Sequence, residues 1–294
     1  MSDVMHRQIV PRLNIYREPA DAAASIGEVK RTLSVWEQIS GQATVRRFTI
    51  LIVLAAIWQI YAVTLHNELM LPSFSATLSA FYDAVVHGTL ASRTFFSLQI
   101  LLIGYAIGIV LAGLLVSLAV ATRIGNDLLT TLTAMFNPLP AIALFPLALL
   151  WFGLGQSSIV FVIVHSVLWA VALNTHTGFQ AVSDTLRMAG RNFGLRGFRY
   201  IAQILIPAAF PSILNGLKIG WAFAWRTLIA AELVFGATSR SGGIGWYIFE
   251  NRNSLETANV FAGLLTVIII GLLVEGIVFQ TIEKRSIRRW GMQR

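Results

Sequence analysis

The sequence predicts an all-α membrane protein with six transmembrane helices. Of its 294 residues, 56% are hydrophobic and only 12% are charged. Soluble globular chains carry about 25% charged residues, so half of that share indicates a protein whose solvent is the bilayer. The mean hydropathy of +0.70 agrees with this class. Long stretches without any charge alternate with short basic segments, which is the pattern of a chain that crosses a membrane repeatedly.

The formal net charge of +8 could also suggest a nucleic-acid partner. The basic residues, however, cluster at the ends of apolar runs, and that placement is typical of membrane topology. We therefore expect the chain to lie in a lipid bilayer and not to bind nucleic acid. The chain contains no cysteine, which excludes disulfides and thiolate metal sites.

Residues 1–47 are mixed in polarity and contain no long apolar run. We expect them to form a cytosolic tail without a removable signal peptide. Within the tail, residues 33–48 combine apolar side chains with a basic pair, Arg46 and Arg47. This part could lie as a short helix on the membrane surface.

The first two predicted spans are residues 48–65 and 94–122. The first is long enough to cross a hydrocarbon layer of about 30 Å. The second contains no charged residue and carries Gly104 and Gly108 one helical turn apart. Small residues at this spacing favour close contact between helices. The connection at 66–95 is polar and includes a weakly amphipathic part at 75–87.

Residues 128–183 contain no Asp, Glu, Lys or Arg over 56 positions, which is enough for two spans with a turn at 153–157. The first of these spans contains Asn137, Pro138, Pro140 and Pro146. Prolines remove backbone hydrogen bonds and bend a helix, which is tolerated only where protein or water satisfies the carbonyls. This broken helix could line a pathway or could be a structural kink.

Residues 211–236 and 258–281 are predicted as spans five and six. The segment between them, 237–257, resembles a turn followed by an aromatic-rich re-entry at the interface. The six-span permease domain then covers 48–282, and 283–294 form a basic cytosolic tail. Residues 1–47, 184–199 and 283–294 sum to +2, +3 and +4, whereas 66–95 and 237–257 sum to −1 and 0. The excess of positive charge predicts that both termini and the segment 184–199 are cytosolic.

The polar segment 184–207 lies between spans four and five and is rich in arginine and glycine. A helix is expected at 186–193, with Arg187 and Arg191 one turn apart and small Ala189 and Gly190 between them. Gly194 would end this helix, and a second short helix would lead to Pro207, which can start the next span. Such a pair of helices would form a rigid projection whose small residues admit another backbone. A simple solvated loop is the alternative.

The spacing in this segment resembles the signature loop of permease subunits from bacterial ATP-binding-cassette importers. That pattern is Glu-Ala-Ala, three residues, Gly, nine residues, then Ile-x-Leu-Pro. The matching residues are Met188, Ala189, Gly190, Gly194, Ile204, Leu205, Ile206 and Pro207. The chain departs from the pattern with Met188 for Glu, Gly190 for the second Ala and Ile206 for Leu. The resemblance implies that the absence of this Glu could weaken or alter a polar contact to the ATPase.

The resemblance covers roughly residues 48–285, and the segments around Pro138, Trp151 and 224–232 are similar to the nitrate, sulfonate and taurine branch. It implies the type I importer permease fold, with the loop at 184–207 as the coupling helix that contacts the ATPase. It further implies an ATPase dimer, a second permease subunit (a homodimer), an extracytoplasmic binding protein and a bacterial inner-membrane location. ATP and Mg would bind to the ATPase subunits and not to this chain.

No phosphate-cradling loop of the form Gly-x-x-x-x-Gly-Lys-Ser/Thr is present, so ATP hydrolysis is expected elsewhere. His165 and His176 stand 11 residues apart without a zinc-binding pattern, and hydrogen bonds between helices are their simplest role. We therefore predict no catalytic residue, no metal site and no cofactor in this chain. An ion-coupled secondary transporter and a non-transporting scaffold subunit remain as alternatives.

Span five carries three ionisable residues, Lys218, Arg226 and Glu232, with Trp221 and Trp225 beside the basic pair. Charged groups within a span usually face a water-filled cavity or a partner. Arg226, with Lys218, could give an anion a favourable path, since a guanidinium suits sulfonate, carboxylate or nitrate. In the alternative, Arg226 pairs with a carboxylate such as Glu275 while Lys218 extends toward the cytosol.

Overall fold

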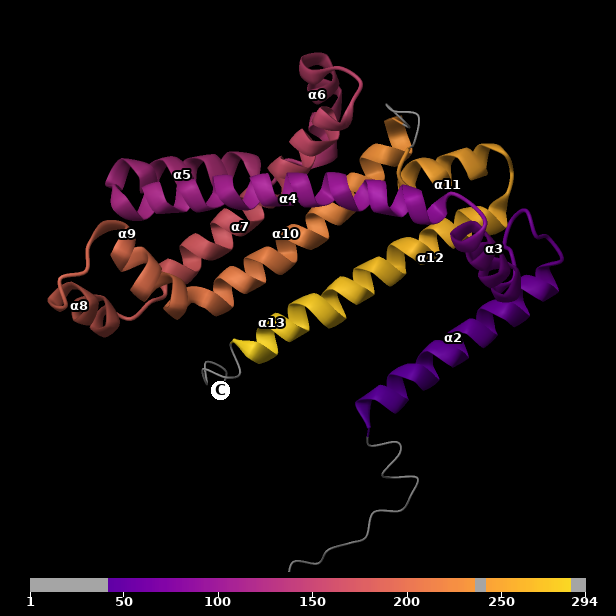
Figure 1. Cartoon of the computed structure of the whole chain (residues 1–294), viewed down its shortest axis with the longest axis horizontal. Coiled ribbons are helices and arrows are strands. Elements are labelled where there is room, and N and C mark those ends of the chain that lie inside the picture. Colours follow the sequence, from indigo (N-terminus) through magenta and orange to yellow (C-terminus); the bar gives the residue numbers. More distant parts are fainter. Residues whose placement is uncertain (1–41, 236–241, 287–294) are drawn as a thin grey trace, which may run out of the picture. The chain divides into compact units, whose positions relative to one another are not determined.

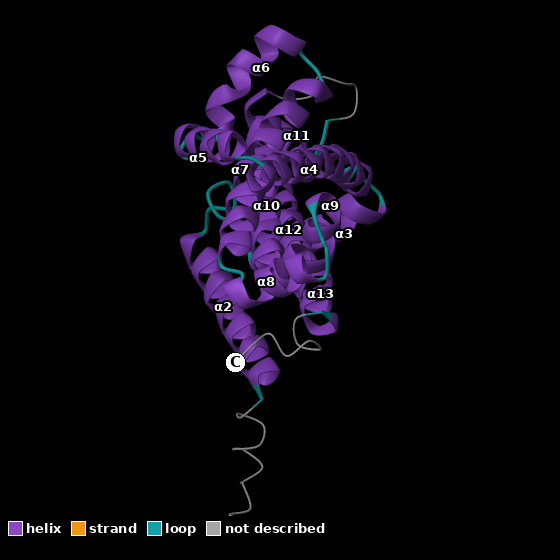
Figure 2. Ribbon diagram, turned by 90° about the vertical axis from the view of Figure 1, so that its left-hand side faces the viewer, coloured by secondary structure: helices purple, strands orange, loops and turns teal. Residues whose placement is uncertain are grey.

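The computed structural model describes residues 42–235 and 242–286. Within these ranges the chain forms α-helices with short 3₁₀ and π segments, and no strand (Figure 1, Figure 2). Most of the predicted surface helix at 33–48, the end of the predicted tail at 283–294 and part of the predicted turn at 237–257 lie outside the described residues. The predicted all-α class is confirmed.

The chain divides into two compact units, Met1–Leu54 and Ala55–Arg294. In the first unit the described residues form the beginning of α2, whose apolar side chains are largely exposed. The elements in chain order are α2 (Ala43–Leu65), α3 (Phe74–Val86), α4 (Leu90–Ala121), α5 (Arg123–Phe136), η2 (Ala141–Leu144), α6 (Phe145–Phe152), α7 (Gln156–Gln180), α8 (Asp184–Asn192), α9 (Gly197–Tyr200), η3 (Ile201–Leu205), α10 (Ile206–Phe235), α11 (Ile244–Asn253), α12 (Thr257–Leu273), η4 (Val274–Phe279) and α13 (Gln280–Arg285).

Five of the helical stretches are long and apolar enough to cross a membrane. They are Val45–Leu65, Leu90–Ala121, Gln156–Gln180, Gly197–Val234 and Thr257–Arg285. A sixth candidate is α5 together with η2 and α6, an apolar pair that is bent by 89° at a short break and has the form of a broken span or a re-entrant loop. Six spans were predicted, so the count agrees when this bent pair is taken as one span. The bend is located at the predicted Asn137–Pro140 segment.

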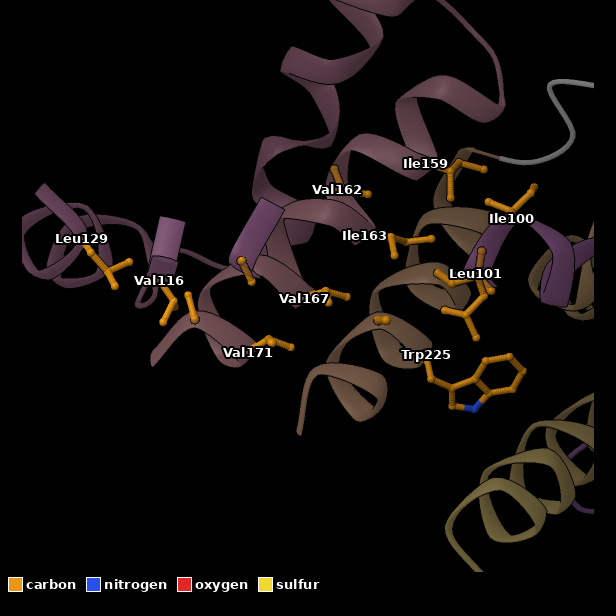
Figure 3. Close-up of a cluster of buried hydrophobic side chains, with 14 of the residues drawn as sticks. Ile100, Leu101, Val116, Leu129, Ile159, Val162, Ile163, Val167, Val171 and Trp225 are labelled. Atoms are coloured by element: carbon orange, nitrogen blue, oxygen red, sulfur yellow. The ribbon is translucent and has the colours of Figure 1, made fainter. Parts of the chain in front are cut away.

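The core of the second unit lies around α7, which packs between α4 and α10. Over half of the most apolar part of α7 is buried (56%), against 17% for the last span. Branched aliphatic side chains fill the contacts, including Ile163 and Val167 on α7 and Leu101 on α4 (Figure 3). Burial of this kind within the chain leaves the outer helices to face lipid or other subunits.

Close packing of α4 on α7 depends on the two glycines predicted to form a small-residue face. A Cβ on Gly104 would lie 2.6 Å from Cγ2 of Ile163, and one on Gly108 would lie 2.7 Å from Cβ of Val167. Any side chain at these positions would push the helices apart. The prediction of a close helix contact is confirmed.

The start of span five differs from the prediction. Pro207 does not begin a helix, because the chain is already helical from Gly197 and continues as one span to Val234. The helix passes Pro207 through the π segment η3, where the N–H of Ile206 bonds to the carbonyl of Ile201, five residues back. This wider turn accommodates the proline that would otherwise remove a bond and collide with the preceding turn. The predicted start at 211 was therefore wrong.

Candidate functional site

The basic loop between α7 and α10, residues 181–205, contains α8 and α9. The predicted first helix is present as α8, whereas α9 is not a separate second helix, because it continues through η3 into span five. Ser183 begins α8 by accepting a hydrogen bond on its side chain from the N–H of Leu186. Gly194 ends it with a positive φ of 75°. The N–H of Gly194 bonds to the carbonyl of Arg191, and that of Leu195 bonds to Gly190, which is the Schellman arrangement. Glycine is favoured here because other residues rarely adopt this backbone conformation.

The role predicted for Gly190 needs correction. Its small size was expected to admit the backbone of another protein, but Gly190 is buried within this chain. A Cβ there would lie 2.9 Å from Cγ1 of Ile204 and 3.3 Å from the ring of Tyr200. The glycine thus lets α8 pack on the start of span five. Ala189, beside it, is half-buried.

Arg187 is also directed inward. Its Nε donates to the carbonyl of Val182 at 3.0 Å, and its Nη2 donates to the carbonyl of Phe179. Phe179 lies in the last turn of α7, and Val182 is two residues beyond its end. The carbonyl of Phe179 also accepts a backbone hydrogen bond from the N–H of Val182, so the guanidinium adds a further donor there and ties α8 to the end of α7. Arg187 is therefore a positioning residue within the chain.

The outward surface of the loop is formed by other residues. Phe193 is 84% exposed, Phe198 is 76% exposed and Met188 is 57% exposed. Arg191 is exposed as well, whereas Ile204 and Pro207 are half-buried on the continuous helix. Sequence reasoning missed the two phenylalanines, although aromatic residues within a short polar segment were a usable signal.

A cavity of about 370 Å³ lies at the break between α5 and η2. Its lining comes from the break itself, from α7 and from α10. The lining residues are Phe136, Asn137, Pro138, Leu139, Pro140, Ala141, His165, Ser166, Trp169, Phe223, Arg226 and Thr227. The structure therefore brings the predicted Asn137, Pro138 and Pro140 together with the predicted Arg226. No carboxylate is among the lining residues.

Arg226 presents its charge to this cavity. Its Nε donates to the carbonyl of Ala222, one turn back, at 3.1 Å, and its guanidinium carbon lies 5.2 Å from the ring centre of Phe223. Within the described part of the chain it forms no ion pair, and its side chain is exposed. The two terminal nitrogens of the guanidinium carry no hydrogen bond to the described residues. The expected alternative pairing with Glu275 does not occur.

Lys218 lies apart from the cavity. Its Nζ donates to Glu283 at 2.8 Å and is 3.9 Å from Glu275, so it joins α10 to the last helical segment. It therefore neither shares a site with Arg226 nor extends alone toward solvent. Trp221 packs at right angles on Tyr105, and Trp225 is buried in the core shown in Figure 3. None of these residues lines the cavity.

Glu232 is 2% exposed and has a packing role that was not predicted. Oγ of Ser97 on α4 lies 2.8 and 2.9 Å from its two carboxylate oxygens, and the N–H of Gly245 donates to Oε2 at 2.8 Å. The N–H of Ile244 in turn donates to Ser97. The buried carboxylate thus fastens the start of α11 to α4 and α10. A Cβ on Gly243 would lie 2.1 Å from Oε1 of Glu232, so the position requires glycine.

Three cavity residues on α7, His165, Ser166 and Trp169, were not predicted as site residues, although His165 was noticed. His165 and Trp169 stand one turn apart and meet Phe136, which stacks on Trp169 with ring centres 5.4 Å apart. His176, in contrast, is buried near the end of α7, and its Nε2 lies 3.4 Å from the amide of Gln180. It contacts its own helix instead of the expected neighbouring one.

The amino-acid sequence matches a known protein family. Residues 104–289 match the model of the binding-protein-dependent transport system inner membrane component. This stretch contains the break, α7, the basic loop, α10 and the whole of the last span, Thr257–Arg285.

Curated relatives cover most of the chain. A putative ABC transporter permease of Methanocaldococcus jannaschii is 29% identical over 84% of this chain and 92% of its own length. A putative aliphatic sulfonates transport permease of Escherichia coli is 30% identical over 76% of this chain and 83% of its own length. A nitrate import permease of Synechocystis is also 30% identical, over 76% and 82%.

Proposed function

The chain belongs to the family of inner membrane components of binding-protein-dependent transport systems, and on that basis we propose that it is the permease subunit of an ATP-driven anion importer. As a multi-pass membrane protein with five candidate spans, and a sixth if the bent pair is one span, it would form the path for a small organic or inorganic anion. The relatives named for aliphatic sulfonates and nitrate support the anion class. A sulfonate, taurine, nitrate or an aromatic carboxylate fits this class.

The observation that carries the anion assignment is the placement of Arg226. A charged side chain in a span is costly in lipid and is therefore found facing water or a partner. Arg226 lines a cavity of about 370 Å³ that has no carboxylate in its lining. A positive charge without a counter-ion attracts an anion and repels a cation. The guanidinium also offers paired donors to sulfonate, carboxylate or nitrate oxygens.

The proposed assembly has two copies of this chain, a dimer of ATP-binding-cassette ATPases and an extracytoplasmic binding protein. ATP and Mg would bind to the ATPases, so this chain would not itself be an enzyme. We place the chain in the bacterial inner membrane. The positive charge of the basic loop and of both chain ends supports a position of these three segments on the cytosolic side. The exposed Phe193 and Phe198 make the basic loop suitable for insertion into the ATPase surface.

The contacts of α8 support a route for coupling. Arg187 ties α8 to the end of α7, and Gly190 packs against Ile204 at the start of span five. A displacement of α8 by the ATPase would therefore move α7 and α10 together. Both helices line the cavity together with the break at Asn137–Pro140. Motion at the basic loop would thus change the shape of the proposed anion path.

Reconstitution tests this proposal. The chain would be placed in proteoliposomes with its ATPase and binding protein, and uptake of a radiolabelled alkylsulfonate or of nitrate would be followed. ATP-dependent uptake that needs both partners supports the importer. Uptake driven by an ion gradient without the ATPase would instead identify a secondary transporter. Co-isolation of the partners without any uptake would indicate a scaffold subunit.

A further inference from the structure

The cavity beside Arg226 contains hydrogen-bonding groups with no partner. Both ring nitrogens of His165 and Nε1 of Trp169 are buried, with less than 1 Å² of each exposed, and none has a hydrogen-bond partner in the described residues. Trp169 as a whole is only 7% exposed. Leaving a buried donor unpaired costs about 1–3 kcal/mol, so such groups call for an explanation.

These groups lie together and on the same side of α7. His165 and Trp169 are four residues apart, and both line the cavity that Arg226 also lines. The ring of Phe136, at the end of α5, lies against both, with its centre 6.3 Å from that of His165 and 5.4 Å from that of Trp169. Phe136 directly precedes the break at Asn137–Pro140. A change of the bend at this break would therefore move the ring that packs on both side chains.

We propose that His165 and Trp169 are the specificity-determining donors of a binding site for an organic oxyanion, with Arg226 as its fixed charge. The anion meets the exposed guanidinium first. Displacement of Phe136 then turns the imidazole and indole N–H groups toward the oxyanion. This assignment rests on the proposed anion importer and adds the ligand's chemical form to it.

The walls of the cavity favour an anion with an apolar body. Phe136, Trp169 and Phe223 contribute aromatic surface, and the volume of about 370 Å³ falls in the range of small-molecule sites. Nitrate, with one nitrogen and three oxygens, would leave most of this space to water. A zwitterion such as taurine would bring an ammonium group for which the lining has no carboxylate. An alkyl- or arylsulfonate, or an equivalent carboxylate, matches both the donors and the aromatic walls.

The test measures binding to the assembled complex of this chain and its ATPase in nanodiscs, without the binding protein. Radiolabelled benzenesulfonate is the probe, with unlabelled nitrate, taurine and benzylamine as competitors. His165→Phe and Trp169→Phe remove the N–H groups and keep aromatic rings. Trp225→Phe is the matched control, because Trp225 is equally buried on α10 but does not line the cavity. His165→Asn restores a donor.

We expect each of the two Phe variants at His165 and Trp169 to weaken benzenesulfonate binding by about tenfold to hundredfold, as for the loss of a hydrogen bond to a charged group. Trp225→Phe should bind as wild type, and His165→Asn should recover part of the loss. Nitrate, taurine and benzylamine should each compete at least about tenfold more weakly than unlabelled benzenesulfonate.

Three results would overturn the inference. The first is wild-type affinity in both Phe variants; if Arg226→Gln still loses binding, the anion path stands without the two donors. The second is equal competition by nitrate and benzenesulfonate. The third is no benzenesulfonate binding by a complex that imports anions once the binding protein and ATP are added. Absence of ATP-driven import by the wild-type complex with its binding protein would count against the proposed function instead. Thermal unfolding of each variant identifies any that fail to fold.

Discussion

Nε of Arg187 lies 3.0 Å from the carbonyl oxygen of Val182, so the first helix of the basic loop is fastened to the end of α7. Replacing Arg187 with Gln removes the donors that also reach Phe179. Hydrogen bonds from a charged group contribute about 1.5–3 kcal/mol, and partial exposure reduces this, so we expect a loss of about 1–2 kcal/mol in unfolding free energy. Thermal unfolding in detergent measures it.

Arg191→Gln is the control for that substitution. Arg191 lies one turn further along α8 and is exposed, with no side-chain hydrogen bond to the described residues. The Arg191→Gln substitution should therefore leave the melting temperature unchanged. Equal melting temperatures for the two variants would show that Arg187 does not hold α8 in place.

The exposed phenylalanines predict where the ATPase binds. Phe193→Glu places a charge on a side chain that is 84% exposed, so folding should be unaffected. If the loop inserts into an apolar pocket of the ATPase, burying the charge should abolish co-isolation of the two proteins. Affinity purification of the tagged chain from cells that express both subunits measures this.

Met70→Glu is the matched control, because Met70 is 71% exposed and lies between α2 and α3. In the proposed six-span topology, three spans separate it from the basic loop, so it would lie at the opposite membrane face. The amount of ATPase that co-isolates with Met70→Glu should equal the amount that co-isolates with the wild-type chain. Undiminished ATPase recovery with Phe193→Glu would rule out this part of the loop as a docking surface.

The buried contact between Ser97 and Glu232 predicts an unusual sensitivity at Gly243. An added Cβ would lie 2.1 Å from Oε1 of Glu232 and 2.2 Å from Oγ of Ser97. Gly243→Ala should therefore displace α11 and lower the unfolding free energy by about 1–3 kcal/mol. Gly113→Ala, on α4, meets open space and should be neutral or stabilise by up to about 1 kcal/mol. Similar melting temperatures for the two variants would contradict the packing described.

Local chemistry made much of the fold predictable. Charge-free runs marked the spans, and Gly104 with Gly108 marked the contact of α4 with α7 because only glycine leaves room for Ile163. Gly194 marked the end of α8 for a similar local reason, since its φ of 75° suits glycine. The extension of span five past Pro207 could not be predicted, because the π turn at 201–205 depends on the whole helix.

Site residues were predicted less completely, because the sequence does not give inter-helical distances. Arg226, Pro138 and Pro140 were identified because a charge or a broken helix is energetically costly in a membrane, and the structure places them at one cavity. Lys218 has the same cost, yet it pairs with Glu283, 65 positions away. His165 and Trp169 looked like ordinary residues of a span. They are distinguished only by their position at the cavity beside the break and by ring nitrogens that have no hydrogen-bond partner among the described residues.

Uptake by the reconstituted importer carrying Arg226→Gln tests the central claim most directly. The control is Lys218→Gln, which removes a basic residue from the same helix but outside the cavity. Both variants should assemble with the ATPase and respond to the binding protein. Arg226→Gln should lower the rate of anion uptake at least about tenfold, as expected when a charged hydrogen-bond donor is lost, whereas Lys218→Gln should retain most of it. Wild-type uptake by an assembled Arg226→Gln complex would show that the anion does not pass this arginine.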